Sequence, residues 1–194
     1  MMKNTNTPAI RFKGFTDAWE QRKVSYMVDR MSTSAESGIL PSIEYEDIES
    51  DIGLLNKDVF KKNIRKNGTE FQSGDVLFGK LRPYLKNWLY CRFSGVAIGD
   101  FWVLRPSKSF GLFFYYFIQT EGFQSIANQS TGTKMPRSDW KLVSEYSSFI
   151  PRTQTEQQKI AEVVHSIDTL ITLHQRKLDL LKNIKKSLLQ KMFV

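Results

Sequence analysis

Two turn-rich stretches carry the cations best placed to bind a ligand. The first spans residues 79–87 and follows an expected strand, so that Lys80, Arg82, Tyr84 and Lys86 lie on a loop at the end of a sheet. An arginine can contact a guanine edge or a phosphate in bidentate fashion, lysines suit phosphates, and a tyrosine can stack or donate a hydrogen bond. Because loops held by rigid strands commonly carry binding residues, we expect a binding loop here; an ordinary charged turn is the alternative.

The second stretch, residues 132–140, combines a glycine with two cations, Lys134 and Arg137, and Ser138 could cap a short helix. Backbone amides together with the two cations would form a phosphate clamp. Alternatively, the glycine only marks a turn. We expect the apolar side chains of Met135 and Trp140 to be structural in either case.

A third and weaker candidate is the basic segment 63–68, in which Arg65 and Lys66 precede an Asn-Gly pair. Basic Asn-Gly turns are common on solvated surfaces. We therefore rank these two cations below those of the first two stretches.

The chain offers little for catalysis. Ser138 and Lys141 have the serine-x-x-lysine spacing of some acyl-transfer enzymes, but the companion motifs are missing. The acidic stretch 44–51 could hold magnesium, yet carboxylates of an alternating strand mostly point to solvent or to a protein partner. There is no phosphate-binding or dinucleotide-binding glycine motif, and the two histidines are not spaced as metal ligands. We expect no catalytic residue, no metal and no cofactor in this chain.

Charge is unevenly distributed along the sequence. The net charge is +8, but residues 36–58 contain seven acids and one lysine, so the remainder has a balance of +14. Such a surface attracts polyanions, including nucleic acids. Lysine-rich surfaces also simply keep proteins soluble, so charge alone does not decide between these interpretations.

Cysteine usage and hydropathy favour a cytoplasmic protein. A single cysteine excludes a disulfide framework, and the reducing cytosol fits such a composition. The longest apolar run, residues 110–118, is much shorter than the roughly 20 residues needed to cross a bilayer, and residues 1–8 lack a signal-peptide core.

The sequence predicts an α+β fold in which a β-rich globular domain, residues 1–150, precedes one long helix, residues 151–194. An apolar anchor at 10–23 is expected to fasten the start of the chain. Expected strands are 43–48, 75–78, 88–93 and 101–104, with a last extended piece at 149–150, and expected short helices are 112–119 and 122–128.

Residues 155–193 read as one helix without glycine or proline, about 58 Å long at roughly 1.5 Å per residue. Its start is marked by a capping box, either Thr153 with Glu156 or Thr155 with Gln158. A stripe recurs at spacings of four and three, and eight of its ten positions are apolar: Ile160, Val164, Ile167, Ile171, His174, Leu178, Leu181, Lys185, Leu188 and Met192. Such a stripe implies a partner helix, and the polar His174 more often fixes helix register than binds metal.

Four ordered segments carry a family resemblance: 10–23 (IRFKGFTDAWEQRK), 75–84 (DVLFGKLRPY), 132–140 and 151–193. Together they resemble the specificity (S) subunit of bacterial type I restriction-modification systems over nearly the full chain. The resemblance implies a non-catalytic subunit whose target recognition domain reads double-stranded DNA and whose helix docks methyltransferase (M) subunits, which bind S-adenosylmethionine. Restriction (R) subunits are possible further partners.

An S subunit typically contains two such units in tandem, whereas this chain resembles one. It is either a fragment or a short subunit that pairs with its own copy, and the exposed stripe favours a homodimer through an antiparallel coiled coil. Two identical modules would then read an interrupted palindrome. A second apolar row, formed by Leu170, Leu173, Leu180, Ile184 and Leu189, is expected to contact an M subunit.

Two other readings remain open at this point. A scaffold or inhibitor-like interaction protein of the same complex would keep the helix but not read DNA. An autonomous nuclease would cleave DNA by itself in a magnesium-dependent reaction.

Overall fold

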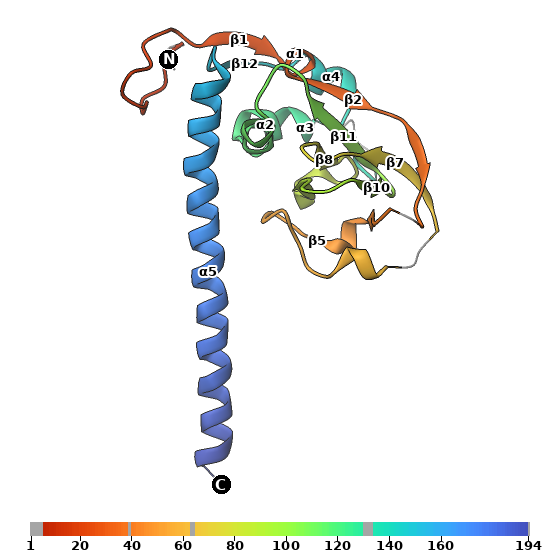
Figure 1. Ribbon diagram of the computed structural model, residues 1–194, viewed down its shortest axis with the longest axis vertical. Coiled ribbons are helices and arrows are strands. Elements are labelled where there is room, and N and C mark those ends of the chain that lie inside the picture. Colours follow the sequence, from red (N-terminus) through yellow and green to blue (C-terminus); the bar gives the residue numbers. More distant parts are fainter. Residues whose placement is uncertain (1–5, 39, 63–64, 130–133, 194) are drawn as a thin grey trace. The chain divides into compact units, whose positions relative to one another are not determined.

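The computed structural model describes residues 6–38, 40–62, 65–129 and 134–193 (Figure 1). The chain divides into two units, Met1–Gln158 and Lys159–Val194. The first unit contains all of the strands, and the second consists of the greater part of one helix. The predicted α+β class with a long C-terminal helix is thus confirmed.

One four-stranded antiparallel sheet lies at the centre of the first unit. Its order is β2-β11-β8-β9, formed by Val28–Met31, Phe101–Pro106, Val76–Gly79 and Trp88–Tyr90. Every residue of β8 is buried, as are the first four of β11. Burial on both faces explains why these strands read as continuous apolar runs without alternation.

A second sheet has the order β3-β7-β10-β4, formed by Ser34–Glu36, Asn67–Phe71, Gly95–Ala97 and Ser42–Ile43. Only the β10–β4 pair is parallel. Apolar side chains from both sheets form one buried cluster that includes Phe71, Leu77 and Val103. The two sheets are therefore held together by a common core.

Short helices complete this unit: α1 (Val24–Met27), α2 (Gly111–Phe117), α3 (Glu121–Ala127) and α4 (Trp140–Glu145). The side chain of Phe123 in α3 contacts Phe78 of the central sheet, with ring centroids 5.6 Å apart. Thr120 caps α3 by accepting a hydrogen bond from the Phe123 amide. The expected helices at 112–119 and 122–128 are confirmed to within two residues.

The expected strand at 43–48 is wrong. The chain leaves β4 at Ile43 and forms a 3-10 helix, η1 (Tyr45–Asp47), before β5 (Ile48–Glu49) pairs with β6 (Leu54–Leu55). Another 3-10 helix, η2 (Val59–Lys61), follows. The backbone turn at η1 places the Asp47 carboxylate inside the unit, where it is fully buried.

The N-terminal segment is fastened by a β-ribbon and an ion pair. Strand β1 (Glu20–Lys23) pairs with β12 (Ser147–Ile150) in antiparallel fashion. The Arg11 guanidinium donates to both carboxylate oxygens of Glu156, at 2.7 and 2.9 Å, and the Trp19 indole donates to one of them at 3.2 Å. These hydrogen bonds lower the pKa of Glu156, with Arg11 the main cause. The segment 10–23, expected to be an apolar anchor, is therefore held by strand pairing and by the polar contacts of Arg11 and Trp19, and Ile10 is exposed.

Helix α5 (Gln154–Met192) begins at a half-formed capping box. The Glu156 amide donates to the Thr153 hydroxyl at 3.3 Å, but the Glu156 side chain binds Arg11 and Trp19 instead of returning to the cap. The side chain of Gln157 is buried. Its carboxamide oxygen accepts a hydrogen bond from the Phe110 backbone amide, and its nitrogen donates to the Pro151 carbonyl.

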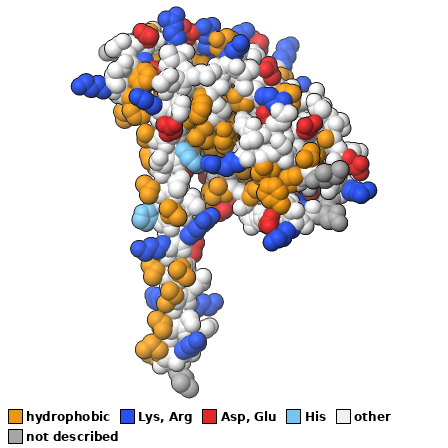
Figure 2. Space-filling model, in the orientation of Figure 1, with side chains coloured by type: hydrophobic (Ala, Val, Ile, Leu, Met, Phe, Trp, Pro, Cys, Tyr) orange, Lys and Arg blue, Asp and Glu red, His pale blue; other side chains and the backbone are white. Residues whose placement is uncertain are grey.

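Most apolar side chains of α5 after residue 162 are exposed, and Figure 2 shows orange apolar side chains among blue lysines and arginines on one face of the helix. Within the described ranges, no helix is both long and apolar enough to span a membrane.

Candidate nucleic-acid interface

The loop after β8 is a tight, strained reversal. The Gly79 amide donates to the Asn87 carbonyl at 2.7 Å, and a 3-10 helix, η3 (Pro83–Leu85), lies between them. Arg82 and Lys86, the residues on either side of η3, both have left-handed backbones, with φ of 49° and 56°. Such conformations are uncommon for residues other than glycine and cluster at functional sites.

The second basic stretch lies directly beside this loop in its described part, residues 134–140, while residues 132 and 133 lie outside the described residues. Leu81 and Arg137 form an antiparallel β-bridge. On either side of it, the Arg82 amide donates to the Pro136 carbonyl and the Ser138 amide donates to the Lys80 carbonyl, both at 2.8 Å. Leu81 and Arg137 are more than fifty residues apart in the sequence, so their pairing joins two distant segments into a single surface.

Asp100 joins the cations of the two stretches. Its carboxylate accepts a hydrogen bond from Arg137 at 3.0 Å and lies 3.5 Å from the Lys80 ammonium. The hydrogen bond from Arg137 is the main reason that the pKa of Asp100 lies below its usual value, and the same contact raises the pKa of Arg137. Asp100 is therefore ionised at neutral pH and acts as an acceptor for two cations.

Tyr45 binds the backbone on both sides of this ion-pair cluster. Its hydroxyl donates to the Asp100 carbonyl at 2.6 Å and accepts from the Leu81 amide at 3.2 Å. Its ring packs edge-on against Phe101, with centroids 4.5 Å apart. Burial raises the pKa of Tyr45 to about 12, so the hydroxyl remains protonated and able to donate. Sequence reasoning missed both Tyr45 and Asp100.

The other predicted residues of the two stretches are exposed on this surface. Lys86 forms an ion pair with Asp51 at 2.9 Å. The side chains of Arg82, Tyr84 and Lys134 have no hydrogen bond or ion pair within the part of the chain that the structure describes. Tyr84 is 55% exposed. A ligand can therefore bind these three side chains without first breaking a hydrogen bond or ion pair to another described residue.

Ser138 does not cap a helix as expected. It is buried, and its hydroxyl donates to the Ala127 carbonyl at 2.6 Å. The cap of α4 is Asp139, whose carboxylate accepts from the Lys141 amide at 2.8 Å. Met135 is half-exposed and so is not the core residue that its apolar character suggested.

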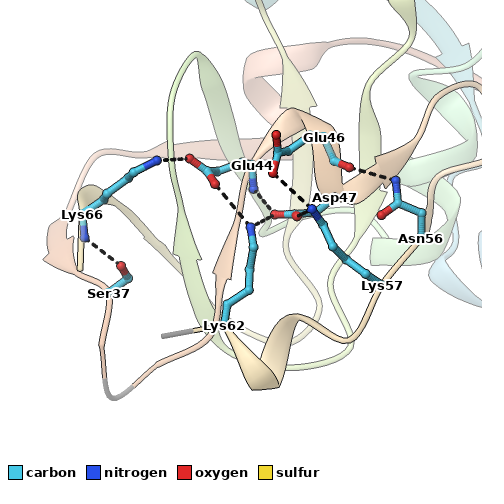
Figure 3. A network of polar contacts seen from close by, with 8 residues as sticks. All are labelled: Ser37, Glu44, Glu46, Asp47, Asn56, Lys57, Lys62 and Lys66. Atoms are coloured by element: carbon cyan, nitrogen blue, oxygen red, sulfur yellow. Dashed lines mark hydrogen bonds and ion pairs between the residues drawn. The ribbon is translucent and has the colours of Figure 1, made fainter. Parts of the chain in front are cut away.

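The third basic segment belongs to a different polar network (Figure 3). Residues 63 and 64 lie outside the described residues, Arg65 is exposed, and the following Asn-Gly pair lies in β7 instead of a turn. The Lys66 ammonium binds Glu44 at 2.6 Å, and its backbone amide donates to Ser37 at 3.0 Å.

Asp47 lies at the centre of that network. Its side chain is fully buried and binds Lys62 at 2.6 Å and Lys57 at 2.9 Å. Burial alone would raise the pKa of Asp47, but hydrogen bonds from Lys62, the Glu44 amide and Lys57 outweigh it and leave the pKa below its usual value. The expectation that these carboxylates point to solvent or to a partner is wrong for Asp47 and Glu44, because the chain's own lysines bind them.

Among the described residues, no group of three or more histidine, cysteine, aspartate or glutamate side chains is arranged to hold a metal ion. Cys91 is buried, and burial raises the pKa of its thiol well above the usual value. A thiol in that state is a poor nucleophile.

The chain was compared with protein-family models, curated proteins and solved structures. No protein-family model matches the chain. The type I restriction enzyme HindI specificity subunit of Haemophilus influenzae is 29% identical over 143 residues, which are 69% of this chain and 29% of that protein.

Solved structures with the same fold include the HsdS subunit of Thermoanaerobacter tengcongensis, with a TM-score of 0.63 and 19% identity over 95% of this chain and 49% of that one. The S subunit of a type I system from M. genitalium has a TM-score of 0.57 and 16% identity, covering 90% of this chain and 46% of that one. A chain from a study of complex assembly and conformational transition in a type I restriction-modification system has a TM-score of 0.63 and 16% identity, covering 96% and 50%.

The chain therefore has the fold of type I specificity subunits. Its sequence similarity points to the same class, so the resemblance predicted from the sequence is confirmed. The chain spans about half the length of the solved subunits and aligns with less than a third of the curated relative.

Proposed function

We propose that this chain is a DNA-recognition subunit of a type I restriction-modification system, without catalytic activity of its own. Its DNA-reading surface comprises the predicted residues of the two joined stretches: Lys80, Arg82, Tyr84, Lys86, Lys134 and Arg137. The observation that carries the proposal is the β-bridge between Leu81 and Arg137, which merges two independently basic segments into one exposed surface. Arg65 and Lys66 are secondary candidates.

The chemistry of this surface suits duplex DNA. Cations bind phosphates and set the register of the protein on the duplex, while arginine can read a guanine edge. Arg82 and Lys134 are exposed, and they lack intramolecular ion pairs among the described residues. The exposed Tyr84 adds a ring that can stack or donate a hydrogen bond.

The charge of helix α5 supports an antiparallel homodimer. Residues 154–175 contain three acids and one lysine, whereas residues 176–191 contain six cations and one acid, Asp179. An antiparallel pair places the acidic half of each helix beside the basic half of its partner, while a parallel pair would place the basic halves together. The exposed stripe from Ile167 to Met192 would be buried between the helices.

Such a dimer would hold two identical DNA-reading units apart, so its target would be bipartite and palindromic. The second apolar row, which includes the exposed Leu173 and Leu180, remains on the outside of the helix pair for an M subunit. S-adenosylmethionine would then be bound by the M subunit, and R subunits could join the same complex in the cytoplasm.

DNA binding is tested by fluorescence anisotropy with a random-sequence duplex at two salt concentrations. Phosphate contacts predict a slope of log affinity against log salt of about −0.9 for each contact. A triple variant, R82Q with K134Q and R137Q, should flatten that slope. The control is a triple variant with the same change of charge at lysines that do not belong to the proposed DNA-reading surface, and it should keep the wild-type slope. The chain offers three exposed lysines for this control: Lys13, Lys61 and Lys108. Wild-type protein without any salt-dependent binding would favour the scaffold alternative.

Pairing through α5 is tested by size-exclusion chromatography with light scattering. Replacing Ile171 and Leu178 by glutamate should convert a dimer into a monomer, because charged residues would enter the seam. Gln175→Glu adds charge to the same helix outside the stripe and should leave the dimer intact. A wild-type monomer at micromolar concentration that also fails to bind an M subunit would contradict this part of the proposal.

A further inference from the structure

Asp100 is an anionic residue that lies between cations expected to bind DNA phosphates. It is held by Arg137 from one basic stretch and by Lys80 from the other, at 3.0 and 3.5 Å. The side chain of Asp100 is 29% exposed and that of Arg137 is 54% exposed, so solvent and ligands reach both groups. In the free protein the carboxylate therefore lies between two of the cations that the proposed function assigns to DNA.

The backbone of Asp100 is fixed independently of its carboxylate. Its carbonyl accepts hydrogen bonds from the Tyr45 hydroxyl at 2.6 Å and from the Lys80 amide at 2.9 Å. The preceding Gly99 has a φ of 96°, a conformation that glycine adopts without strain. A substitution that only removes the charge of Asp100 should leave these contacts in place, so the effect of the charge can be measured by itself.

We propose that Asp100 is an electrostatic restraint on sequence-independent DNA binding. It competes with DNA phosphates for Arg137 and Lys80, so either cation must leave the carboxylate before it contributes fully to binding. This inference rests on the proposed function and deepens it. Binding to unrelated duplexes is almost wholly electrostatic, so Asp100 weakens this binding most. Binding to a target sequence also includes contacts to base edges, which Asp100 does not oppose.

The first test compares wild-type protein with D100N on a random-sequence duplex of about 30 base pairs, because binding to a duplex without a target sequence is almost wholly electrostatic. D100N should bind about two- to fivefold more tightly, the range expected for the loss of an exposed competing ion pair. The control is E145Q, because Glu145 is an exposed carboxylate that also pairs with a lysine, Lys23, and the change of net charge is the same. E145Q should bind like wild-type protein.

The second test is a double-mutant cycle. R137Q should weaken binding more in the D100N background than in the wild-type background, because Arg137 no longer has to leave Asp100 when it binds a phosphate. Equal losses in the two backgrounds would show that the carboxylate does not compete with DNA. A purely structural Asp100 would instead make D100N bind more weakly.

The outcomes separate this inference from the proposed function. If wild-type protein binds the duplex but D100N binds no more tightly than E145Q, the proposed role of Asp100 is wrong. The proposed DNA-binding surface would be unaffected by that result. If wild-type protein shows no binding at all, both fail together. D100S is a second neutral variant for the same comparison, with circular dichroism as the check on folding, and it should show the same gain.

Discussion

Asp47 and Asp100 are both aspartates held between two cations, but solvent reaches only one of them. The side chain of Asp47 is 0% exposed and binds Lys57 and Lys62. The side chain of Asp100 is 29% exposed and binds Lys80 and Arg137. The same pattern of charges therefore occurs once inside the first unit and once at the candidate DNA-binding surface.

The difference shows how burial changes the role of an ion pair. A buried carboxylate that loses its cations is left uncompensated in a medium of low polarity, so such a pair is costly to open. An exposed pair is worth little because water replaces either partner. Asp47 accordingly fixes the chain around η1, while the cations of Asp100 remain exchangeable with a ligand.

The largest effect is expected from breaking the buried site. D47N should lower the free energy of unfolding by about 3 kcal/mol, because Lys62 and Lys57 lose a buried counter-charge. D100N should change it by less than about 1 kcal/mol, as is usual for exposed pairs. Urea unfolding followed by circular dichroism measures both values.

The affinity for DNA should change in the opposite pattern for the same two variants, D47N and D100N. Folded D47N should bind a random duplex like wild-type protein, whereas D100N should bind more tightly. If D47N tightened binding as much as D100N, the two sites would not differ in the way that their burial indicates.

Acid should weaken the first unit through Asp47 and Glu44. Both pKa values lie below the ordinary values of 3.8 and 4.5. The unfolded chain therefore binds protons at a higher pH than the folded chain does, and the stabilisation, complete above these ordinary values, is lost as pH falls below them. Urea unfolding between pH 7 and pH 3 should show this loss, and D47N should show a smaller one. Identical pH dependence in D47N and wild-type protein would exclude Asp47 as a source.

The long helix and the buried strands were predictable because their signals are local. Helix α5 has a cap at Thr153 and a stripe that recurs along its whole length, and strands β8 and β11 are apolar runs bounded by turn residues. Strands β3, β7 and β10 escaped prediction because they are short or polar and are stabilised by pairing with distant segments. Gly68, for example, lies so close to Ala97 that a Cβ there would meet the Ala97 carbonyl oxygen at 2.3 Å.

The candidate site was predictable in its cations but not in its assembly. Glycines, prolines and basic residues mark the two stretches, but nothing local indicates that Leu81 pairs with Arg137. Asp100 and Tyr45 are important because of where the fold places them. An aspartate after a glycine and a tyrosine within an acidic stretch have no distinctive sequence signal. Whether the predicted cations contact DNA remains a prediction.

A smaller effect is expected from Tyr45→Phe. The Leu81 amide would lose its acceptor and the Asp100 carbonyl one of its donors, at a cost of about 1 kcal/mol in the free energy of unfolding. The ring contact with Phe101 would remain. Urea unfolding of Y45F measures this cost, with Tyr26→Phe as a control on an exposed tyrosine. Equal stability of Y45F and wild-type protein would show that the hydroxyl does not hold Leu81 and Asp100 in place.

The smallest effect, and the sharpest for the comparison of the two sites, concerns single cations at the DNA-binding surface. Arg82 has no ion pair among the described residues, whereas Arg137 must leave Asp100 before it binds a phosphate. R82Q should therefore weaken binding to a random duplex by about threefold and reduce the salt slope by about 0.9, and R137Q should cost less. K57Q, which removes a cation from the Asp47 site, should leave DNA binding unchanged. A loss for R137Q that equalled or exceeded the loss for R82Q would mean that Asp100 orients Arg137 toward DNA, and the carboxylate would then assist binding.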